Sequence, residues 1–581
     1  MGAKVAWSRA PAAPPYLAPA PATMDLPALT PADLRAQTVG ADAVVETPFG
    51  RRPLVYADYT ASGRQLAFVE DHLRALAPLY ANAHTEDSLT GRAATDLLRD
   101  AEAAIKRAVN AGPGGKAVCV GTGSTGAIHK LQEILGIAIP PVTLEALRDA
   151  VPGGAAALRE RGPVVFVGPY EHHSNEVMWR EGLCTVVEVP LGDDGQVCLG
   201  ALGRALDDPR WAGRRLVGSF SAGSNVTGVL APVREIARAL HARGALALFD
   251  YAAAGPYVEV DMRPEGDPGG RLDAVFLSPH KFLGGPGACG LLVFDESLYR
   301  HDLAPSVGGG GTVTYVNERD HDYTADVEAR ETAGTPGLFQ TLRAAYALEV
   351  KRAVGVDAIR EREHAHLRRA LAAWGGEKRI DVLGPHVGDV ERLAIVSFNV
   401  RDGRGGVLHP RFVTVLLDDL FGVQSRAGCS CAGPYGHRLL GIGPDQSARY
   451  RQCILDGLGG LKPGWARVGL HYALDDDEVG YLVDAVRFVA RHGARFLALY
   501  DFDLGSGAWT HRDGRAATPR FSLADALGGT VYAESVSGDA RRRLYADALA
   551  EAERLAGSLP APTGGAVLEG DLEELQFFAL P

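Results

Sequence analysis

The stretch Asp273-Ala-Val-Phe-Leu-Ser-Pro-His-Lys281-Phe-Leu-Gly-Gly-Pro-Gly287 joins a short apolar run to a turn that is dense in glycine. The apolar run predicts a buried β-strand, and the turn places Lys281 directly after it. A lysine attacks a carbonyl carbon only as the neutral amine, which partial burial or a cationic neighbour such as His280 favours. The stretch therefore predicts a Schiff-base lysine at a strand end, with an ordinary solvated lysine as the alternative.

A second apolar run, Ala245-Leu-Ala-Leu-Phe-Asp250, ends in an aspartate and continues into small residues. Continuous apolarity predicts a strand that is buried on both faces, as in a parallel sheet covered by helices. Open α/β sheets bind their ligands at the carboxyl ends of such strands. Asp250 is either a helix N-cap or a partner for the protonated ring nitrogen of pyridoxal 5′-phosphate (PLP), which its charge would keep cationic. Because Lys281 follows about thirty residues later at its own strand end, the pair favours a PLP site.

Further motifs follow in the order of a known family. They are Gly121-Thr-Gly-Ser-Thr125, Glu171-His-His173, Ser224-Asn-Val226, Glu331-Thr-Ala-Gly-Thr-Pro336, Arg426-Ala-Gly-Cys-Ser-Cys431-Ala and Trp465-Ala-Arg467. Over residues 56–489 the chain resembles the fold-type I, class V PLP enzymes, and within them the cysteine desulfurase and selenocysteine lyase branch of the SufS type. The resemblance implies an α/β fold in which a large domain holds a mostly parallel, seven-stranded-type sheet between helices. A smaller C-terminal α/β domain would follow it.

The resemblance also implies a set of cofactor-binding residues. They are Ser124, Thr125, His172, Asn225, Asp250, Ser278, His280, Lys281 and Thr335. Ser124 and Thr125 would form a phosphate cup at a helix N-terminus, where free N–H groups favour an anion. His172 would stack on the cofactor ring and carry protons, and Asn225 would bind the 3′-oxygen. Thr335 would reach the phosphate of the neighbouring subunit, which implies a homodimer.

Substrate chemistry is expected in the C-terminal part of the chain. The resemblance makes Cys431 the catalytic nucleophile, together with Lys281 and His172 as catalytic groups. Desulfuration needs a thiolate, which a cation such as Arg426 favours. Arg467 would bind the substrate carboxylate, and His84 is a second candidate for substrate binding.

The chain departs from the family pattern at two places. Ala253 stands where the family has a glutamine near the cofactor, and Cys429 and Ser430 stand where it has histidines. The tuning of the cofactor and of the Cys431 thiol can therefore differ from the family. The remaining cysteines are scattered, so no metal site is expected.

The function that these motifs favour is cysteine desulfurase, which converts cysteine to alanine and leaves a persulfide on the enzyme, or selenocysteine lyase. The alternative is a PLP enzyme of the same fold that performs C–S lysis, transamination or epimerisation on another amino acid or metabolite. A silent scaffold is disfavoured because it has no need of the catalytic set. The expected partners are an amino-acid substrate, a second subunit and a sulfur-acceptor protein.

Composition agrees with a globular enzyme, since 46% of the 581 residues are hydrophobic and 22% are charged. The net charge of −12 argues against nucleic acid as a partner. Seven cysteines, odd in number, indicate a reducing and cytoplasmic location, and no apolar run is long enough for a membrane span.

The chain is too long for one core, so several domains are expected. The expected parts are a disordered Pro/Ala-rich segment (1–28), a PLP-binding large domain (29–345) with an insertion (140–161), a small domain (346–491) and an extension of unknown role (492–581). Within these parts, residues 412–417 are expected to form a strand of the small domain, and residues 338–354 a helix.

Overall fold

The computed structural model describes residues 27–83, 85, 87–385, 390–514, 522, 534–562 and 565–581. Residues 1–26 of the segment expected to be disordered lie outside the described residues. So does His84, the second candidate for substrate binding.

A seven-stranded sheet forms the centre of the large domain, in the order β4-β10-β9-β8-β7-β5-β6. The strands are β4 (Gly115–Val120), β5 (Val164–Val167), β6 (Thr185–Glu188), β7 (Leu216–Ser221), β8 (Leu246–Asp250), β9 (Ala274–Leu277) and β10 (Gly290–Asp295). Only β10 runs against its neighbours, and the other strands are parallel to one another. The carboxyl ends of six strands therefore meet along one edge, and the predicted mostly parallel sheet is confirmed.

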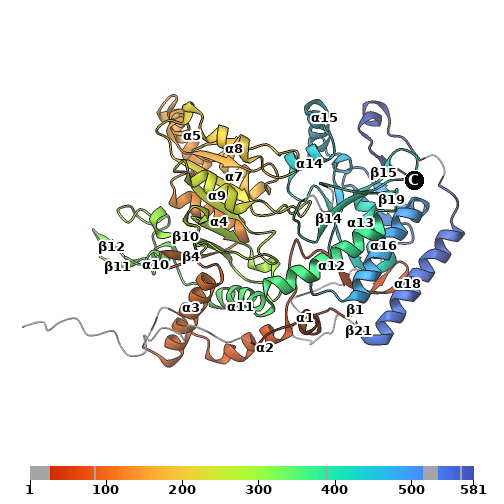
Figure 1. Cartoon of the computed structure of the whole chain (residues 1–581), viewed down its shortest axis with the longest axis horizontal. Coiled ribbons are helices and arrows are strands. Elements are labelled where there is room, and N and C mark those ends of the chain that lie inside the picture. The colour runs from red at the N-terminus through yellow and green to blue at the C-terminus, as the bar shows by residue number, and fades with distance from the viewer. Residues whose placement is uncertain are drawn as a thin grey trace, which may run out of the picture.

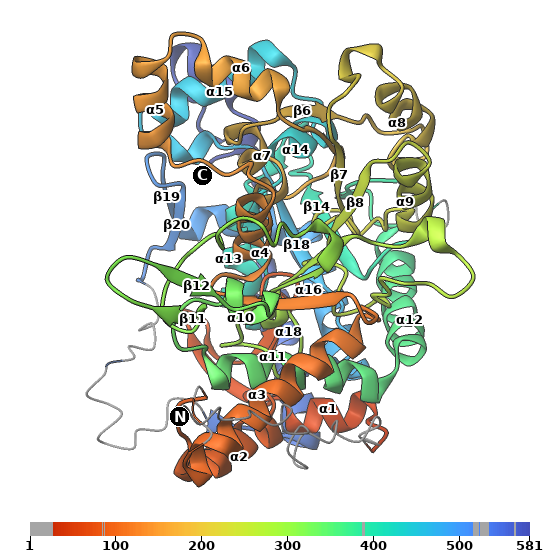
Figure 2. The same ribbon diagram turned by 90° about the vertical axis from the view of Figure 1, so that its left-hand side faces the viewer.

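Helices cover both faces of this sheet (Figures 1 and 2). Along β8, Leu248 packs into one cluster with α4 (Gly123–Ile134) and α7 (Val177–Glu181). Its neighbour Phe249 packs into the other cluster. That second cluster contains α3 (Leu89–Ala108), α8 (Leu199–Leu206), α9 (Val233–His241) and α11 (Leu338–Val354). Successive side chains of a strand point to opposite faces, so burial on both faces explains why the strand sequences are continuously apolar.

The small domain contains an antiparallel sheet in the order β13-β14-β18-β17. Its strands are β13 (Ile380–Val382), β14 (Ile395–Val400), β17 (Arg426–Gly428) and β18 (Trp465–Gly469), and its main helices are α12 (Val356–Trp374), α13 (Pro410–Phe421) and α16 (Asp476–Phe496). The long helix α11 leads into this domain from the large one, and its bounds match the helix expected at residues 338–354.

The strand expected at residues 412–417 is wrong, because these residues lie inside α13. Pro410 occupies the first turn, and the side chain of His409 accepts the Arg411 N–H at the N-cap. Buried residues recur at helical spacing along α13, at Phe412, Val413, Leu416, Leu417, Leu420 and Phe421. The β-branched and apolar residues suggested a strand. The apolar pattern is longer than a typical strand, however, and Pro410 at its start favours a helix.

The C-terminal extension wraps around the small domain (Figure 1). Its elements are β19 (Tyr500–Asp503), β20 (Ala508–His511), β21 (Glu534–Ser535), α18 (Gly538–Ser558) and β22 (Phe578–Ala579). Strand β21 pairs with β1 (Ala43–Thr47), which also pairs with β2 (Gly50–Pro53), and β22 pairs with β15 (Val407–Leu408). Tyr545 of α18 stacks on Tyr481 of α16, with ring centroids 4.3 Å apart. The extension is thus built into the small domain.

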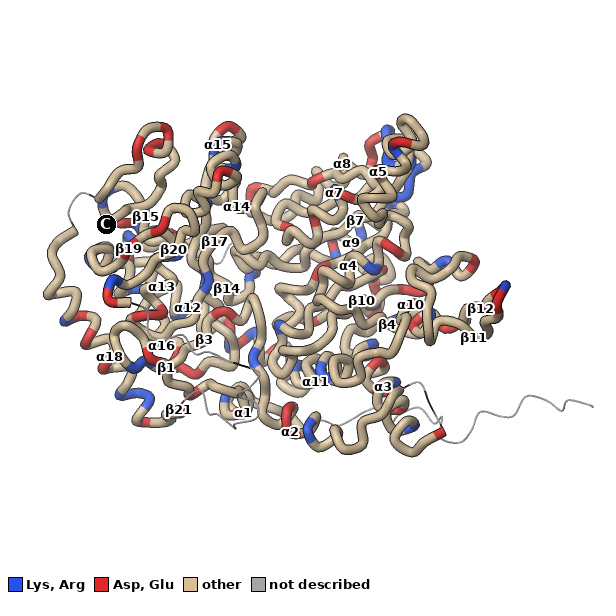
Figure 3. Tube along the Cα trace, turned by 180° about the vertical axis from the view of Figure 1, so that it is seen from behind, with Lys and Arg blue, Asp and Glu red and all other residues tan. Residues whose placement is uncertain are grey.

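The remaining elements lie around these two cores. They are α1 (Pro31–Gln37), β3 (Val55–Tyr56), α2 (Ala67–Leu76), α5 (Pro141–Ala150), α6 (Gly154–Arg161), β11 (Val313–Val316), β12 (His321–Tyr323), α10 (Val327–Glu331), β16 (Val423–Gln424), α14 (Gly433–Leu439) and α15 (Pro444–Leu455). Helices α5 and α6 occupy the segment for which an insertion is expected (140–161), and they lie at the outer edge of the large domain (Figure 2). Acidic and basic residues are interspersed along the trace (Figure 3). Among the described residues, we find no helix with the length and apolarity that a membrane span requires.

Candidate active site

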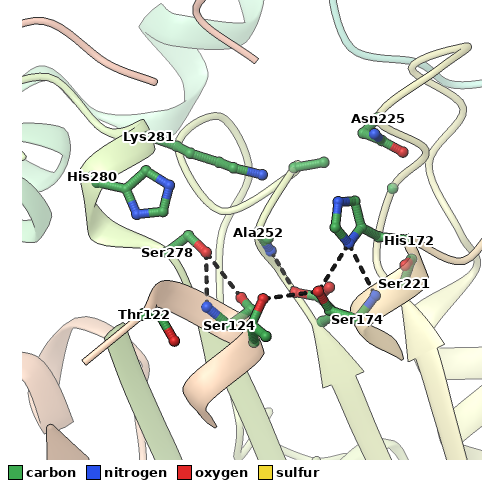
Figure 4. Close-up of a pocket in the computed structure, with 14 residues that line it drawn as sticks. Thr122, Ser124, His172, Ser174, Ser221, Asn225, Ala252, Ser278, His280 and Lys281 are labelled. Carbon is green, nitrogen blue, oxygen red and sulfur yellow. Dashed lines mark hydrogen bonds between the residues drawn. The ribbon is translucent and has the colours of Figure 1, made fainter. Parts of the chain in front are cut away.

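A pocket opens at the carboxyl ends of the parallel strands (Figure 4). It holds about 620 Å³ of empty space, counted to its open mouth. Four adjacent strands, β9, β8, β7 and β5, each lead into a segment that contributes a lining residue. These residues are Lys281, Asp250, Asn225 and His172, in that order. The side chains that the motifs single out one by one are therefore brought together by the order of the strands.

Lys281 and Asp250 form the buried centre of the pocket. Burial lowers the pKa of the Lys281 ammonium, while the negative charge of Asp250 opposes this shift and Arg467 adds to it. Burial likewise raises the pKa of the Asp250 carboxyl, and its Oδ1 accepts the Ala252 N–H at 2.9 Å. Burial therefore favours the neutral amine of Lys281, whereas at Asp250 it opposes the negative charge that the sequence predicted there.

The predicted cationic role of His280 is wrong. Burial lowers the pKa of the His280 imidazole to about 4, so the ring is neutral near pH 7. Of the positive groups whose charge lowers the pKa of Lys281, Arg467 has the larger effect and Arg426 the smaller. A histidine next to a lysine in the sequence looks like a cation, but partial burial beside that lysine disfavours the second charge.

The start of α4 forms a cradle between two loops. Gly123 has φ +55°, and a Cβ atom there would lie 2.8 Å from Ser278 Oγ and 2.9 Å from His280 Cε1. The Ser124 N–H donates to Ser278 Oγ at 2.9 Å, and the two hydroxyls are 3.1 Å apart. Hydroxyls, a helix N-terminus and a glycine that keeps the approach open suit a phosphate. The donor set thus fits the phosphate of the implied cofactor, and the buried Asp250 carboxylate fits its ring nitrogen.

His172 is held in one orientation by Ser174. The Ser174 N–H donates to His172 Nδ1 at 3.1 Å, and Ser174 Oγ lies 3.1 Å from the same nitrogen and 2.8 Å from Thr125 Oγ1. Burial, followed by the charge of Lys281, lowers the pKa of His172 to about 4. His172 is therefore a neutral ring at the pocket wall, linked through Ser174 to the cradle at α4.

Glu171 was not assigned a role from the sequence, yet it ties two strand ends together. It is buried, and its carboxylate accepts the Ser221 N–H at 2.8 Å, Ser221 Oγ at 2.6 Å and Asn175 Nδ2 at 2.7 Å. Ser221 ends β7, whereas Glu171 follows β5. These bonds hold the segment that carries His172 against the neighbouring strand.

Three other predicted positions differ in their placement. Asn225 lines the pocket, and its Nδ2 donates to the carbonyl oxygen of Ser430 at 2.7 Å. Ala253 also lines the pocket and brings no polar side chain there. Thr335 is exposed and is not among the residues that line this pocket. Thr335 therefore contributes no side chain to the lining of this pocket in its own subunit.

The small domain brings two arginines to the mouth of the pocket. Arg426 of β17 and Arg467 of β18 are directly opposed in the antiparallel register. Asp58 holds both, since its Oδ1 accepts from Arg467 Nη2 at 3.0 Å and its Oδ2 accepts from Arg426 Nε at 2.9 Å. Arg467 also donates to the Asn225 carbonyl oxygen at 2.9 Å. Sequence reasoning missed Asp58, although it lies within the range 56–489 over which the chain resembles the family.

Cys431 stands on a tight turn between β17 and α14. Ser430 and Cys431 have φ values of +51° and +56°, and the Ala432 N–H donates back to the Cys429 carbonyl oxygen at 3.1 Å. The turn is tied to the large domain, because the His173 N–H donates to the Cys431 carbonyl oxygen at 2.8 Å. Positive φ is uncommon outside glycine, so this backbone is held by its surroundings. The Cys431 thiol is exposed, and its charge would raise the pKa of Lys281.

Comparison with known proteins places this geometry in a family. The model of the family "Aminotransferase class-V" matches residues 145–482, which is more than half of the chain. The chain belongs to the aminotransferase class-V family. The resemblance inferred from the motifs is thereby confirmed.

Among the proteins that are similar to this chain, several are named as cysteine desulfurases. The "Probable cysteine desulfurase" of Halobacterium salinarum is 33% identical over 340 residues, covering 57% of this chain and 71% of that protein. The "Cysteine desulfurase" of Dickeya dadantii is 29% identical over 403 residues, covering 67% and 86%. Among solved structures, the apo cysteine desulfurase of Thermococcus onnurineus NA1 is 20% identical with a TM-score of 0.62, over 80% of this chain and all of that one. This likeness confirms the predicted fold.

Proposed function

We propose that this class-V enzyme is a PLP-dependent cysteine desulfurase, which releases alanine from cysteine and keeps the sulfur on Cys431. One observation carries the proposal. The turn that bears Cys431 is fastened to the pocket by two hydrogen bonds, from Asn225 to the Ser430 carbonyl oxygen and from His173 to the Cys431 carbonyl oxygen. A thiol held at the mouth of a lysine pocket is what sulfur transfer requires.

The cofactor would be held by the cradle at α4 and by Asp250. Ser124, Thr125 and Ser278 would bind its phosphate, and the Asp250 carboxylate would bind its ring nitrogen. When bound, PLP supplies an electrophilic aldehyde and an electron sink for carbanion chemistry. His172 offers a neutral imidazole at the pocket wall for stacking and proton movement, and Asn225 offers its amide on the same side.

Lys281 would take the proton from the α-carbon of the substrate and return one later. Its burial favours the neutral amine that this role needs. Arg467 would bind the substrate carboxylate, because its planar guanidinium matches a carboxylate at two points. Asp58 would orient Arg467 through its existing bond, and Arg426 would contribute a second positive charge.

Cys431 would act as the sulfur acceptor in its thiolate form. Its sulfur attacks the substrate sulfur, so that an S–S bond forms while the C–S bond of the substrate breaks and alanine leaves after protonation.

We further propose a homodimer, a sulfur-acceptor protein and a cytoplasmic location. The exposed Thr335 and the exposed hairpin of β11 and β12 support a site that is completed by a second subunit. All seven cysteines lie in the described part of the chain and are free thiols, as expected in a reducing compartment.

The test is an absorbance spectrum of the purified protein after addition of PLP, followed by cysteine. We expect a visible band, alanine as a product, and loss of alanine but not of the band in Cys431→Ala. Cys198→Ala, which changes a thiol at the start of α8, is the matched control and should keep both. Pyruvate, ammonia and sulfide in place of alanine would favour C–S lysis instead, and alanine that survives in Cys431→Ala would contradict the role of Cys431. A protein without a band would contradict the role of Lys281.

A further inference from the structure

A second pocket lies on the other side of the cysteine turn. It holds about 870 Å³ of empty space, counted to its open mouth, and its lining includes His173, Cys429, Leu440, Ile454, Lys462 and Trp465. Helices α14 and α15 form one wall of it. None of these residues lines the first pocket. Its lining is mainly apolar, so the second pocket is a separate space that is suited to a soft, poorly hydrated group such as a sulfur atom.

Two adjacent residues on the large domain face the two pockets. His172 lines the first pocket and His173 lines the second. The His173 N–H donates to the Cys431 carbonyl oxygen at 2.8 Å, and its Nε2 accepts the Gly433 N–H at 3.0 Å. The second half of the cysteine turn is therefore fastened at two points to His173, which lines the second pocket.

The turn carries two thiols in different surroundings. Cys431 is exposed near Lys281, whereas Cys429 is partly buried, packs against the core and lines the second pocket. Residues two positions apart have Cα atoms within about 7 Å, and a reversed turn shortens that span. This separation lies in the range over which two cysteine sulfurs can meet.

We propose that Cys429 is a second sulfur-carrying residue, which takes the sulfur from Cys431 and holds it in the second pocket for delivery to an acceptor thiol. This inference rests on the proposed desulfurase function, because Cys431 must first receive the sulfur. It assigns Cys429 to group transfer and not to the tuning of Cys431. It also gives the second pocket a role as the delivery site.

The transfer is a thiol exchange without an external oxidant. The Cys429 thiolate attacks the terminal sulfur of the Cys431 persulfide, and a new bond forms between that sulfur and Cys429 Sγ. The bond between the terminal sulfur and Cys431 Sγ breaks, and its electron pair leaves with Cys431 as a thiolate. Cys429 is oxidised to the same extent as Cys431 is reduced, and the proton that Cys429 loses is available to Cys431.

A free Cys431 can then accept a second sulfur before any acceptor arrives. The holoenzyme, reduced beforehand and then freed of reductant, is mixed with a small excess of cysteine and quenched within a few turnovers. We expect a burst of about two alanines per subunit in the wild type and about one in Cys429→Ser. Cys453→Ser, which changes a thiol on the neighbouring helix α15, should still give about two.

The outcomes separate the two proposals. Alanine formation that persists in Cys431→Ala would overturn the role of Cys431 as the first sulfur acceptor, on which both proposals rest. A burst of about one alanine in both the wild type and Cys429→Ser, with no alanine in Cys431→Ala, would overturn only the transfer to Cys429.

Peptide mass mapping of the wild type keeps the test valid if Cys429→Ser folds poorly. After alkylation of the sulfur-loaded wild type, we expect the extra sulfur on both Cys429 and Cys431, and on Cys429 first to be lost when a small thiol is added. A peptide that has lost two hydrogens, with free sulfide in solution, would show attack on the inner sulfur and a Cys429–Cys431 disulfide. That result would overturn the proposal.

Discussion

The two walls of the active site are built by different means. On the large-domain wall, Lys281, Asp250 and His172 stand at or just after the ends of neighbouring strands, whose hydrogen-bond ladder fixes their spacing. On the small-domain wall, Cys431 stands on a turn and Arg467 on the buried strand β18, and contacts with another domain hold both toward the pocket. A wall built on a buried sheet tolerates the loss of one side-chain contact better than a wall that such contacts hold together.

The small-domain wall also places two positive charges next to each other. Arg426 and Arg467 are directly opposed across two strands, an arrangement in which like charges repel. Asp58 resolves it by accepting from both guanidinium groups, and the side chains of Asp58 and Arg467 are only 12% and 4% exposed. The arrangement of the small-domain wall therefore depends on the carboxylate of Asp58.

The largest effect is expected from Asp58→Asn. Loss of this charge leaves the buried Arg467 beside Arg426 without a counterion, which costs about 3 kcal/mol of unfolding free energy. The KM for cysteine should rise at least about tenfold, because Arg467 loses the bond that orients it. Urea denaturation and steady-state kinetics measure the two effects.

The control for this substitution is Asp71→Asn. Asp71 pairs with Arg74 on an exposed helix face, where both side chains are at least 70% exposed. Such a pair contributes under about 1 kcal/mol, so stability and KM should stay unchanged. Equal behaviour of the two variants would contradict the role of Asp58.

The large-domain wall was easier to predict from the sequence than the small-domain wall. The strand ends at Asp250 and Lys281 were predictable, because burial on both faces leaves a continuously apolar run before each residue. The helix at residues 338–354 was predictable from its periodicity. These features are local in sequence and are enforced by the backbone.

The rest depends on contacts between distant segments. Asp58 lies 368 residues from Arg426, and neither residue type in isolation indicates the pair. The neutral state of His280 depends on burial beside Lys281, which the sequence does not report. Helix α13 was missed because its β-branched residues also suit a strand, and its start at His409 and Pro410 was not recognised.

The start of α13 provides the next test, through the pH dependence of stability. Burial lowers the pKa of His409 to about 4 from 6.5, and its Nδ1 accepts the Arg411 N–H at 3.1 Å. The folded state thus binds fewer protons than the unfolded state between these two pKa values. The contribution of His409 is fully present above pH 6.5 and is lost as the pH falls toward 4, with a size on the order of 3 kcal/mol.

We therefore expect the stability difference between the wild type and His409→Gln to be largest near pH 7 and to shrink steadily below pH 6.5. Urea denaturation at several pH values measures it. His129→Gln, at a site that is more than half exposed, should follow the wild type at every pH. A difference that is constant with pH would mean that His409 has the same pKa in the folded and unfolded states.

The smallest effect is expected at the C-terminal extension, which supports the small-domain wall from behind. Arg541 of α18 is 8% exposed and pairs with Asp475 and with Asp42. Arg541 also lies 3.7 Å from the buried Glu478, which keeps its closer ion pair with Arg35 at 2.9 Å. Because Asp475 and Asp42 are partly solvated, Arg541→Ala should cost about 2 kcal/mol of unfolding free energy, less than the loss of a fully buried pair.

Its neighbour Arg542 gives a matched control. Arg542 is 53% exposed and pairs with Asp477 and Asp539, so Arg542→Ala should cost under about 1 kcal/mol. Neither change should alter the cofactor absorbance band, since α18 packs mainly against α16, β2 and α13. A shifted band in Arg541→Ala alone would show that the extension reaches the large-domain wall, and the two walls would then be less independent than their construction implies.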